Sequence, residues 1–238
     1  VFARQAGILI QNARLHRDTV AAVTRRELLY RLSHRLTATA TLSEIGRTVQ
    51  EAVAQIMPAD TCILATLQSD GHTVRYDYAF EAGIVLPVET VDITETRLAT
   101  HIIRTGETVL FPDISEPEVK QLIGSYFLAG DDAVQRRAVL GTPLRLGERI
   151  VGMLSFQANW PHGYTDDDRD LAELLANLVA SAVENARLYG ETRQRLAESE
   201  LLYDAGLAVS ASLSQDVAIE RILDGLQRVV GYETASVQ

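Results

Sequence analysis

Stretches of alternating or continuous apolar residues predict the strands of a β-sheet. The clearest two, Val139 to Leu146 and Ile150 to Phe156, flank the dipeptide Gly147-Glu148. A two-residue loop that begins with glycine between two such stretches is typical of a hairpin with a type II′ turn. Shorter stretches predict further strands at 61–67, 73–80, 88–93 and 108–111. We therefore expect the hairpin to form the centre of a sheet.

The second strand of this hairpin carries a different set of side chains on each face, because side chains alternate along a strand. One predicted face, with Gly152 allowing a helix to come close, should pack against helices and holds Ile150, Gly152, Leu154 and Phe156. The other should meet something smaller and partly polar and holds Val151, Met153, Ser155 and Gln157. An ordinary two-sided core hairpin shows the same alternation, so the pattern leaves both interpretations open.

Helical spacing of apolar residues predicts helices at 25–36, 42–57, 97–104 and 166–189, and a helix or partly ordered loop at 116–128. Thr165 precedes three aspartates, Asp166 to Asp168. This combination is typical of the first turn of a helix, because threonine and carboxylate oxygens complement the exposed N–H groups there. Capping explains the acidic residues better than a cation site does, and we predict no metal site.

Two blocks of sequence resemble the GAF domain, a small sensory module of bacterial signalling proteins and cyclic-nucleotide phosphodiesterases. The first is RAVLGTPLRLGERIVGMLSFQ followed by GYTDDDRDLAELLANLVASAVENARLY, and the second is ETRLATHIIRTGETVLFPDIS, from Glu95 to Ser115. The resemblance extends over about residues 27–189. It implies an α+β fold, flanked by long linker helices, in which terminal helices cover one face of an antiparallel sheet. Short helices and loops, residues 95–130, should cover the other face.

Two short motifs recur at the same offset along the chain. Asn12-Ala13-Arg14-Leu15 returns as Asn185-Ala186-Arg187-Leu188, and Glu27-Leu28-Leu29-Tyr30 returns as Glu200-Leu201-Leu202-Tyr203. So long a period is typical of a tandem array of whole domains. We expect the closing helix of a preceding unit at 1–19, a linker helix at 20–40, a complete GAF domain at 41–189, a linker helix at 190–211 and the opening of a following unit at 212–238.

The overall charge narrows the class of partner. The formal net charge of the 238 residues is -10. A broad surface for nucleic acid or anionic lipid needs clustered lysines and arginines, so we predict neither partner. No apolar stretch approaches the roughly 20 residues that span a bilayer, and no signal peptide is visible. We therefore expect a cytoplasmic location without membrane contact in this fragment.

The chain lacks the residues of the catalytic and covalently modified branches of the resembled family. Covalent bilin attachment usually needs a Cys-His pair shortly before the strand at Arg137, and QLIGSYFLAGDDAVQ has neither residue. Methionine-sulfoxide reduction works with several cysteines, whereas Cys62 is the only one here. No Walker, dinucleotide, HExxH or GxSxG motif occurs. We predict no enzyme and no catalytic residue; an enzymatic role would require Cys62 to be exposed with a lowered pKa.

The resemblance places a ligand between the partly polar sheet face and its cover at residues 95–130. The candidate pocket residues are His101, Tyr126, Met153, Ser155 and Gln157. A lone histidine on a short helix is more often packed or solvent-facing. Tyr126 and Phe127 can equally close a core. Asp113, another polar residue of this region, is expected to cap the segment after it.

The resemblance implies a non-catalytic sensory and signal-relay module of a larger bacterial protein, such as a histidine kinase of a two-component system or a nucleotide cyclase. A weak coiled-coil spacing at 20–30 and 196–203 fits helices that relay a signal between domains, and it fits a rigid spacer equally well. We expect a homodimer through the terminal and linker helices, whose apolar stripes need cover. The ligand would be an unidentified small molecule. The alternative is a structural dimerisation module without a ligand. A preformed polar pocket favours the sensor, and a sheet face filled by its own side chains favours the alternative.

Overall fold

The structure, a computed structural model, describes residues 23, 25–37, 41–123 and 136–230, with side chains described as far as residue 204. Its elements after the helix at 25–37 are α2 (Leu42–Val53), β1 (Thr61–Leu67), β2 (Thr73–Glu81), β3 (Ile84–Val85), β4 (Glu89–Asp92), the 3₁₀ turn η1 (Ile93–Glu95), α3 (Arg97–Thr105), β5 (Val109–Phe111), α4 (Pro117–Ile123), β6 (Ala138–Leu146), β7 (Arg149–Ala158) and α5 (Asp166–Val230). Two compact units are present, Val1–Ala186 and Arg187–Gln238.

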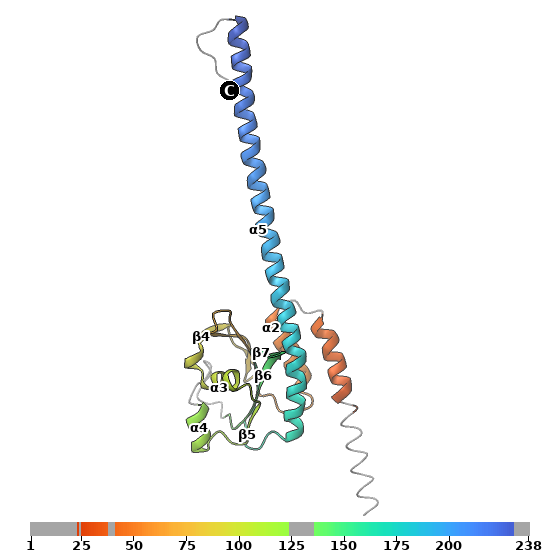
Figure 1. Cartoon of the computed structure of the whole chain (residues 1–238). Coiled ribbons are helices and arrows are strands. Elements are labelled where there is room, and N and C mark those ends of the chain that lie inside the picture. The colour runs from red at the N-terminus through yellow and green to blue at the C-terminus, as the bar shows by residue number, and fades with distance from the viewer. Residues whose placement is uncertain (1–22, 24, 38–40, 124–135, 231–238) are drawn as a thin grey trace, which may run out of the picture. The chain divides into compact units, whose positions relative to one another are not determined.

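The strands of the first unit form one antiparallel sheet, which confirms the predicted α+β fold (Figure 1). The strand order is β3-β2-β1-β7-β6-β5, and β4 pairs with β2. The predicted hairpin is β6 and β7, joined by Gly147-Glu148, and it lies inside the sheet as expected. Gly147 has a φ of 60°, which a type II′ turn requires at its first central residue.

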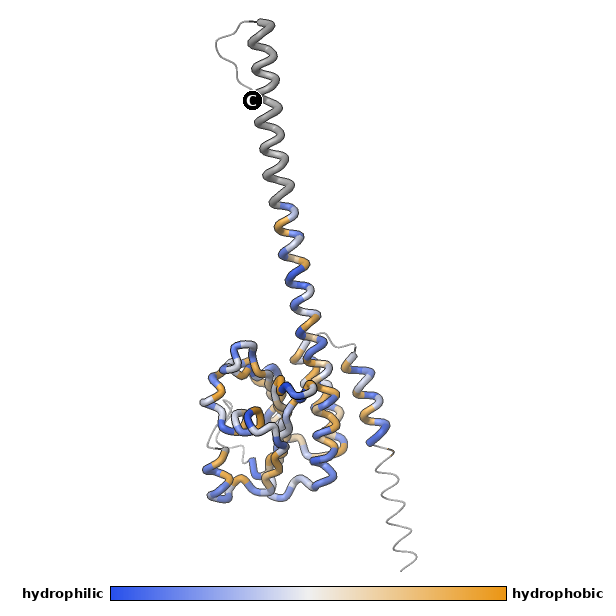
Figure 2. The backbone as a smooth tube through the Cα atoms, in the orientation of Figure 1, coloured by the Kyte–Doolittle hydropathy of each residue, from blue (hydrophilic) through white to orange (hydrophobic). Residues whose placement is uncertain are grey.

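Helices cover one face of the sheet and bury most of the large apolar side chains. Leu28, Leu32 and Leu36 from the helix at 25–37 join Ile45 and Val49 from α2 in this core. The first turns of α5 contribute Leu171, Leu175, Val179 and Val183, and the sheet contributes Leu64, Tyr78, Leu140, Leu154 and Phe156. In Figure 2 the apolar segments of the first unit are concentrated in the sheet and the helices beside it. We call this side of the sheet the helix face.

The N-termini of α2 and α5 are closed by side chains. Thr41 and Glu44 form a capping box at the start of α2. At the start of α5 the Thr165 hydroxyl accepts from the Asp168 backbone N–H at 3.3 Å, and the Asp168 carboxylate accepts from the Thr165 backbone N–H at 2.8 Å. The predicted threonine cap is therefore confirmed. α2 ends at Val53 rather than at the predicted residue 57, and residues 54–56 form a turn after it.

The alternation predicted for β7 holds only beyond a bulge. Leu154 and Phe156 lie on the helix face and Met153 on the other, as expected. Ile150 and Val151 are exchanged, because the pairing of β6 with β7 shifts between Leu144 and Arg145 and one extra residue of β7 is accommodated there. The prediction for these two residues is therefore wrong.

Gly152 is needed for a different reason from the one predicted. A Cβ atom at this position would lie 2.9 Å from the Cα of Thr66 and still closer to the carbonyl oxygen of Ala65. Both atoms belong to the neighbouring strand β1 rather than to a helix. A helix does come close at Gly46 of α2, where a Cβ would lie 2.7 Å from Cδ1 of Tyr78. The close approach of helix and sheet therefore depends on a glycine of the helix.

The opposite face, which we call the α3 face, is covered by α3 and the segment around β4. Ala99 and Ile102 of α3 are fully buried in a second apolar cluster with Ile63, Ala65 and Met153 of the sheet. Gly106 closes α3 in the left-handed conformation with a φ of 69°. The predicted arrangement of a helix-covered face and a face covered by short elements is confirmed.

Helix α5 starts in the first unit and is continuous to Val230. It therefore passes the predicted domain boundaries at 189 and 211 without interruption, and the tandem arrangement stays a prediction. Between Arg187 and Asp204 its residues are mostly polar, with isolated apolar ones (Figure 2). None of the helices described has the length and apolar character needed to cross a membrane.

Candidate functional site

Three of the five predicted pocket residues lie together on the α3 face. Met153, Ser155 and Gln157 alternate along β7, and their exposed fractions are 1%, 0% and 6%. The Met153 end of this face is filled, because Met153 belongs to the apolar cluster with Ala99 and Ile102 of α3. The Ser155 and Gln157 end is polar. The face is thus divided into an apolar half and a polar half.

The polar half is a row of side chains that crosses the sheet. Thr61 of β1 pairs with Glu81 of β2 on one side and with Gln157 of β7 on the other. Directly paired residues of antiparallel strands point to the same face, so all three side chains lie on the α3 face. Ser155 is two residues from Gln157 on the same face. We call Thr61, Glu81, Ser155 and Gln157 the polar row.

An ion pair crosses this row. The Arg136 guanidinium donates to Oε1 of Glu81, and the exposed fractions of the two side chains are only 8% and 3%. Arg136 comes just before β6 and Glu81 ends β2, so β1 and β7 lie between the elements that carry the pair. Burial lowers the pKa of Arg136, because the charged form is poorly solvated there.

Three oxygen atoms of the polar row are buried and have no hydrogen-bond partner among the residues that the structure describes. They are Oγ1 of Thr61, Oε2 of Glu81 and Oγ of Ser155. Buried polar atoms in proteins are nearly always hydrogen-bonded, because an unpaired one has lost its water without compensation. Several such atoms on one face therefore make the polar row a candidate binding site.

Sequence reasoning missed Thr61, Glu81 and Arg136. The sequence held one indication of this site, because Glu81 is an acidic residue at the end of a strand-like stretch. The pairing of this strand with β1 then places the Glu81 side chain on the α3 face. Which of many charged residues becomes buried depends on strand order, however, and the order β2-β1-β7-β6 is set by contacts between distant parts of the chain.

Asp113 positions the segment that contains Arg136. Its carboxylate accepts from the backbone N–H of Ser115 at 2.9 Å, so the predicted capping role is confirmed. It also pairs with Arg137 at 2.6 Å. These hydrogen bonds, first that from Arg137, hold the pKa of Asp113 well below its usual range. Arg137 follows Arg136 directly in the chain. The Asp113 carboxylate that pairs with Arg137 therefore also fixes the backbone next to the buried Arg136.

The structure places His101 apart from the polar row. On α3 the buried residues are Ala99, Ile102 and Ile103, whereas His101 is half-buried and lines a separate hollow of about 310 Å³. That hollow is also lined by Thr94, Arg97, Thr100, Arg104, Thr105 and Leu122. Tyr126 and its neighbour Phe127 lie outside the described residues. His101 is therefore not brought together with Ser155 and Gln157.

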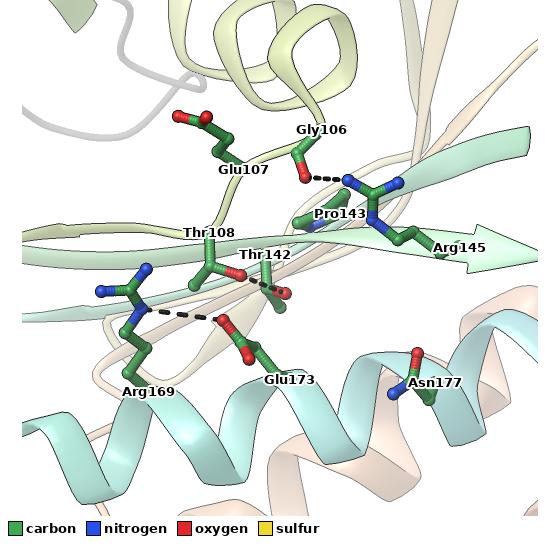
Figure 3. Close-up of a pocket in the computed structure, with 9 residues that line it drawn as sticks. All are labelled: Gly106, Glu107, Thr108, Thr142, Pro143, Arg145, Arg169, Glu173 and Asn177. Atoms are coloured by element: carbon green, nitrogen blue, oxygen red, sulfur yellow. Dashed lines mark hydrogen bonds and ion pairs between the residues drawn. The ribbon is translucent and has the colours of Figure 1, made fainter. Parts of the chain in front are cut away.

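A larger groove of about 500 Å³ lies where the edge of the sheet meets α5 (Figure 3). It is lined by Gly106, Glu107, Thr108, Thr142, Pro143, Arg145, Arg169, Glu173 and Asn177. Several of its polar groups already pair with one another. Arg169 and Glu173 lie 3.6 Å apart, and the Thr108 and Thr142 hydroxyls 3.1 Å apart. Arg145 donates to the carbonyl oxygen of Gly106. The groove thus differs from the polar row, where buried oxygens lack partners.

Cys62 does not meet the condition for thiol chemistry. It is fully buried on the helix face, and burial raises the pKa of its thiol. A nucleophilic cysteine needs access and a stabilised thiolate, and Cys62 has neither. Among the described residues there is also no group of three or more His, Cys, Asp or Glu side chains that could hold a metal ion.

Comparison with known proteins identifies the fold. A family model of the GAF domain matches residues 39–184. The structure is similar to the GAF domain of a phosphoenolpyruvate-protein phosphotransferase from Coxiella burnetii, with 17% identity and a TM-score of 0.54 over 71% of this chain and 98% of that one. It is also similar to a free methionine-R-sulfoxide reductase from Neisseria meningitidis solved in complex with its substrate, with 14% identity and a TM-score of 0.53 over 71% and 93%.

A third similar structure is a methyl-accepting chemotaxis protein, residues 122 to 287, with 18% identity and a TM-score of 0.51 over 66% of this chain and 98% of that one. A comparison with curated protein sequences found no match. At these identities the structural likenesses establish the fold alone.

Proposed function

The chain belongs to the GAF domain family, and from that premise we propose that it is a non-catalytic sensory and signal-relay module that binds a small molecule over the polar row. GAF domains are commonly sensory or regulatory modules, and structural neighbours of this chain include chemotaxis and phosphotransferase GAF domains. The observation that carries the proposal is the set of three buried, unpartnered oxygens on the α3 face. A ligand that supplied hydrogen bonds to these oxygens would offset the free-energy cost of their burial.

The relay would run through α5. Leu171, Leu175 and Val179 of this helix are buried against the helix face of the same sheet whose other face carries the polar row. A shift of β7 on ligand binding would therefore reach α5 through direct packing. Because α5 is one continuous helix to Val230, such a shift is carried along it as a small rotation or displacement. This module would belong to a larger cytoplasmic signalling protein of bacteria, such as a histidine kinase of a two-component system.

A homodimer is the second part of the proposal. Beyond Ala186, large apolar side chains of α5 are exposed, among them Leu196 at 59%, Leu202 at 69% and Tyr203 at 68%. Tyr189, Leu196 and Tyr203 are spaced by seven residues, as in the seam of a coiled coil. A second copy of the same helix would cover them. The alternative function, a dimerisation module without a ligand, is supported by this exposure and by the filled, apolar half of the α3 face.

Native mass spectrometry separates the two functions. The purified chain is measured under gentle and then denaturing conditions. A sensor is expected to show an added mass that is lost on denaturation, and replacing Ser155 with leucine should remove it. Dimers without any added mass, also after incubation with an extract of small metabolites, would support the dimerisation module instead. As a check on the dimer, Leu196→Glu should produce monomers in light scattering, whereas Glu198→Gln should not.

A further inference from the structure

The polar row also indicates what kind of molecule it binds, and this inference rests on the proposed function. Its three unpartnered atoms are a carboxylate oxygen of Glu81 and the hydroxyl oxygens of Thr61 and Ser155. The exposed fractions of these residues are 2%, 2% and 0%. The carboxylate oxygen requires a donor, whereas each hydroxyl can both donate and accept. A ligand hydroxyl can pair with any of the three, because it has one donor hydrogen and two acceptor lone pairs.

Within the described part of the chain, the two buried charges of the site offset each other. Glu81 and Arg136 form a buried ion pair across the row, with exposed fractions of 3% and 8%. A ligand with a net charge would bring an uncompensated ion into this buried place, where ions are strongly disfavoured unless paired. A neutral ligand avoids that cost. It can donate to Oε2 of Glu81 while Arg136 keeps its contact with Oε1.

The strand register sets the size of the ligand. Glu81, Thr61 and Gln157 are consecutive partners on three adjacent strands. Neighbouring strands lie about 4.8 Å apart, so the row extends over roughly 10 Å from Glu81 to Gln157. Hydroxyl groups on adjacent carbons of a six-membered ring can reach several points of such a row at once.

We propose that the polar row binds a neutral polyhydroxylated molecule of about the size of a monosaccharide or cyclitol, with one hydroxyl donating to Glu81 and others exchanging hydrogen bonds with Thr61 and Ser155. The ligand lies along the row from β2 to β7. It supplies hydrogen bonds to the three oxygens, and its binding stiffens the two strands that flank β1.

The test uses probes that share a carbon skeleton and differ in charge. The complete 238-residue chain is unfolded and refolded to remove any retained molecule, and then titrated calorimetrically with millimolar D-glucose, D-gluconate and D-glucosamine. myo-Inositol serves as a second neutral polyol and uracil as a neutral amide. At least one neutral polyol is expected to bind, and the charged analogues of glucose at least tenfold more weakly than glucose. Tighter binding of gluconate, glucosamine or uracil, or no binding of either polyol, would overturn the proposal.

Matched variants of β1 locate the binding. Thr61→Val removes a buried hydroxyl without a partner, and Thr66→Val removes a buried hydroxyl that donates to Asp77 at 2.6 Å. Thr61→Val and Ser155→Ala should each weaken polyol binding tenfold or more while leaving the ligand-free Tm equal or higher. Thr66→Val should lower the Tm and change the affinity less than twofold. Unchanged affinity in both Thr61→Val and Ser155→Ala would contradict the proposed site.

The two proposals fail in different ways. If the native mass shows a retained molecule that proves to be charged, the inference about ligand class is wrong and the sensory function stands. If the chain retains no molecule and binds none of the probes, the ligand-binding function fails together with the inference.

Discussion

The two faces of the sheet are built from the same strands but are packed in different ways. The helix face is closed by α2, α5 and the helix at 25–37, and its large apolar side chains are buried against one another. The α3 face has a smaller apolar cluster and, beside it, a polar row in which three oxygens have no partner among the described residues. Because half of the α3 face is polar, the apolar packing of the helix face must supply most of the stability of the sheet. The helix face therefore stabilises the fold, and the α3 face is the one that we propose for binding.

The neighbouring residues Leu154 and Ser155 show the difference at the shortest range. Both are fully buried in β7, and they point to opposite faces. Leu154 is surrounded by apolar side chains of the helix face, so its burial stabilises the fold. The buried hydroxyl of Ser155 has no partner, so its burial costs free energy. Residues that reduce the stability of a protein are often retained for function.

The largest expected effect on stability is at Gly152. Here the backbones of β7 and β1 are in close contact, and both faces of the sheet depend on that contact. In Gly152→Val, a Cβ atom would lie 2.9 Å from the Cα of Thr66, and the obstacle is backbone that cannot turn aside. We expect a loss of about 4 kcal/mol or more in the free energy of unfolding, measured by urea denaturation. Gly147→Ala is the control. It has a φ of 60° but no neighbour within 4 Å, and should lose only about 1 kcal/mol.

The next largest effect tests the helix face itself. Leu154→Ala should lower the free energy of unfolding by about 3 kcal/mol, because it leaves a cavity in a closed apolar core. Leu174→Ala on α5, where 44% of the side chain is exposed, should change it by no more than about 0.5 kcal/mol. Equal losses at the two leucines in denaturant titrations would mean that the helix face is not the stabilising core described here.

A pH titration tests the same face by a different route. Burial raises the pKa of Tyr78 on the helix face to about 12 from its ordinary value of 10.0. The folded pKa of Tyr78 lies above the unfolded one, so the protonated side chain contributes to the free energy of unfolding. This contribution is complete below pH 10 and is lost as the pH rises toward 12. Over that range the wild type should lose about 1–2 kcal/mol more than Tyr78→Phe. Tyr30→Phe, at an exposed tyrosine, should follow the wild type in alkaline denaturation curves.

The smallest expected effect on stability concerns Asp113, which holds the segment that contains Arg136 of the α3 face. The pKa of Asp113 is lowered in the folded state by Arg137 and Ser115. The contribution of Asp113 to the free energy of unfolding is therefore present above its unfolded pKa of 3.8. It is lost as the pH falls from there through the lowered folded pKa. Asp113→Asn should remove this acid dependence, and the change should be small because solvent reaches both partners of the ion pair. Thermal unfolding between pH 6 and pH 2 measures it; identical acid profiles would show that the pair with Arg137 contributes nothing.

The sequence by itself determined the features that depend on neighbouring residues. The hairpin around Gly147-Glu148, the threonine cap at Thr165 and the capping role of Asp113 each follow from a few consecutive side chains and the backbone groups beside them. The period of two along β7 likewise placed Met153, Ser155 and Gln157 on one face. These features were predictable because the interactions that cause them are local.

Only the tertiary structure decided which side chains meet across the sheet. The bulge that exchanges Ile150 and Val151 arises from the pairing of β6 with β7, and Gly152 is required by the backbone of β1. The ion pair of Glu81 with Arg136 joins residues 55 positions apart in the sequence. Its burial, and the unpartnered oxygens beside it, depend on the strand order β2-β1-β7-β6. No local pattern specifies that order, because it results from the packing of the whole sheet against its helices.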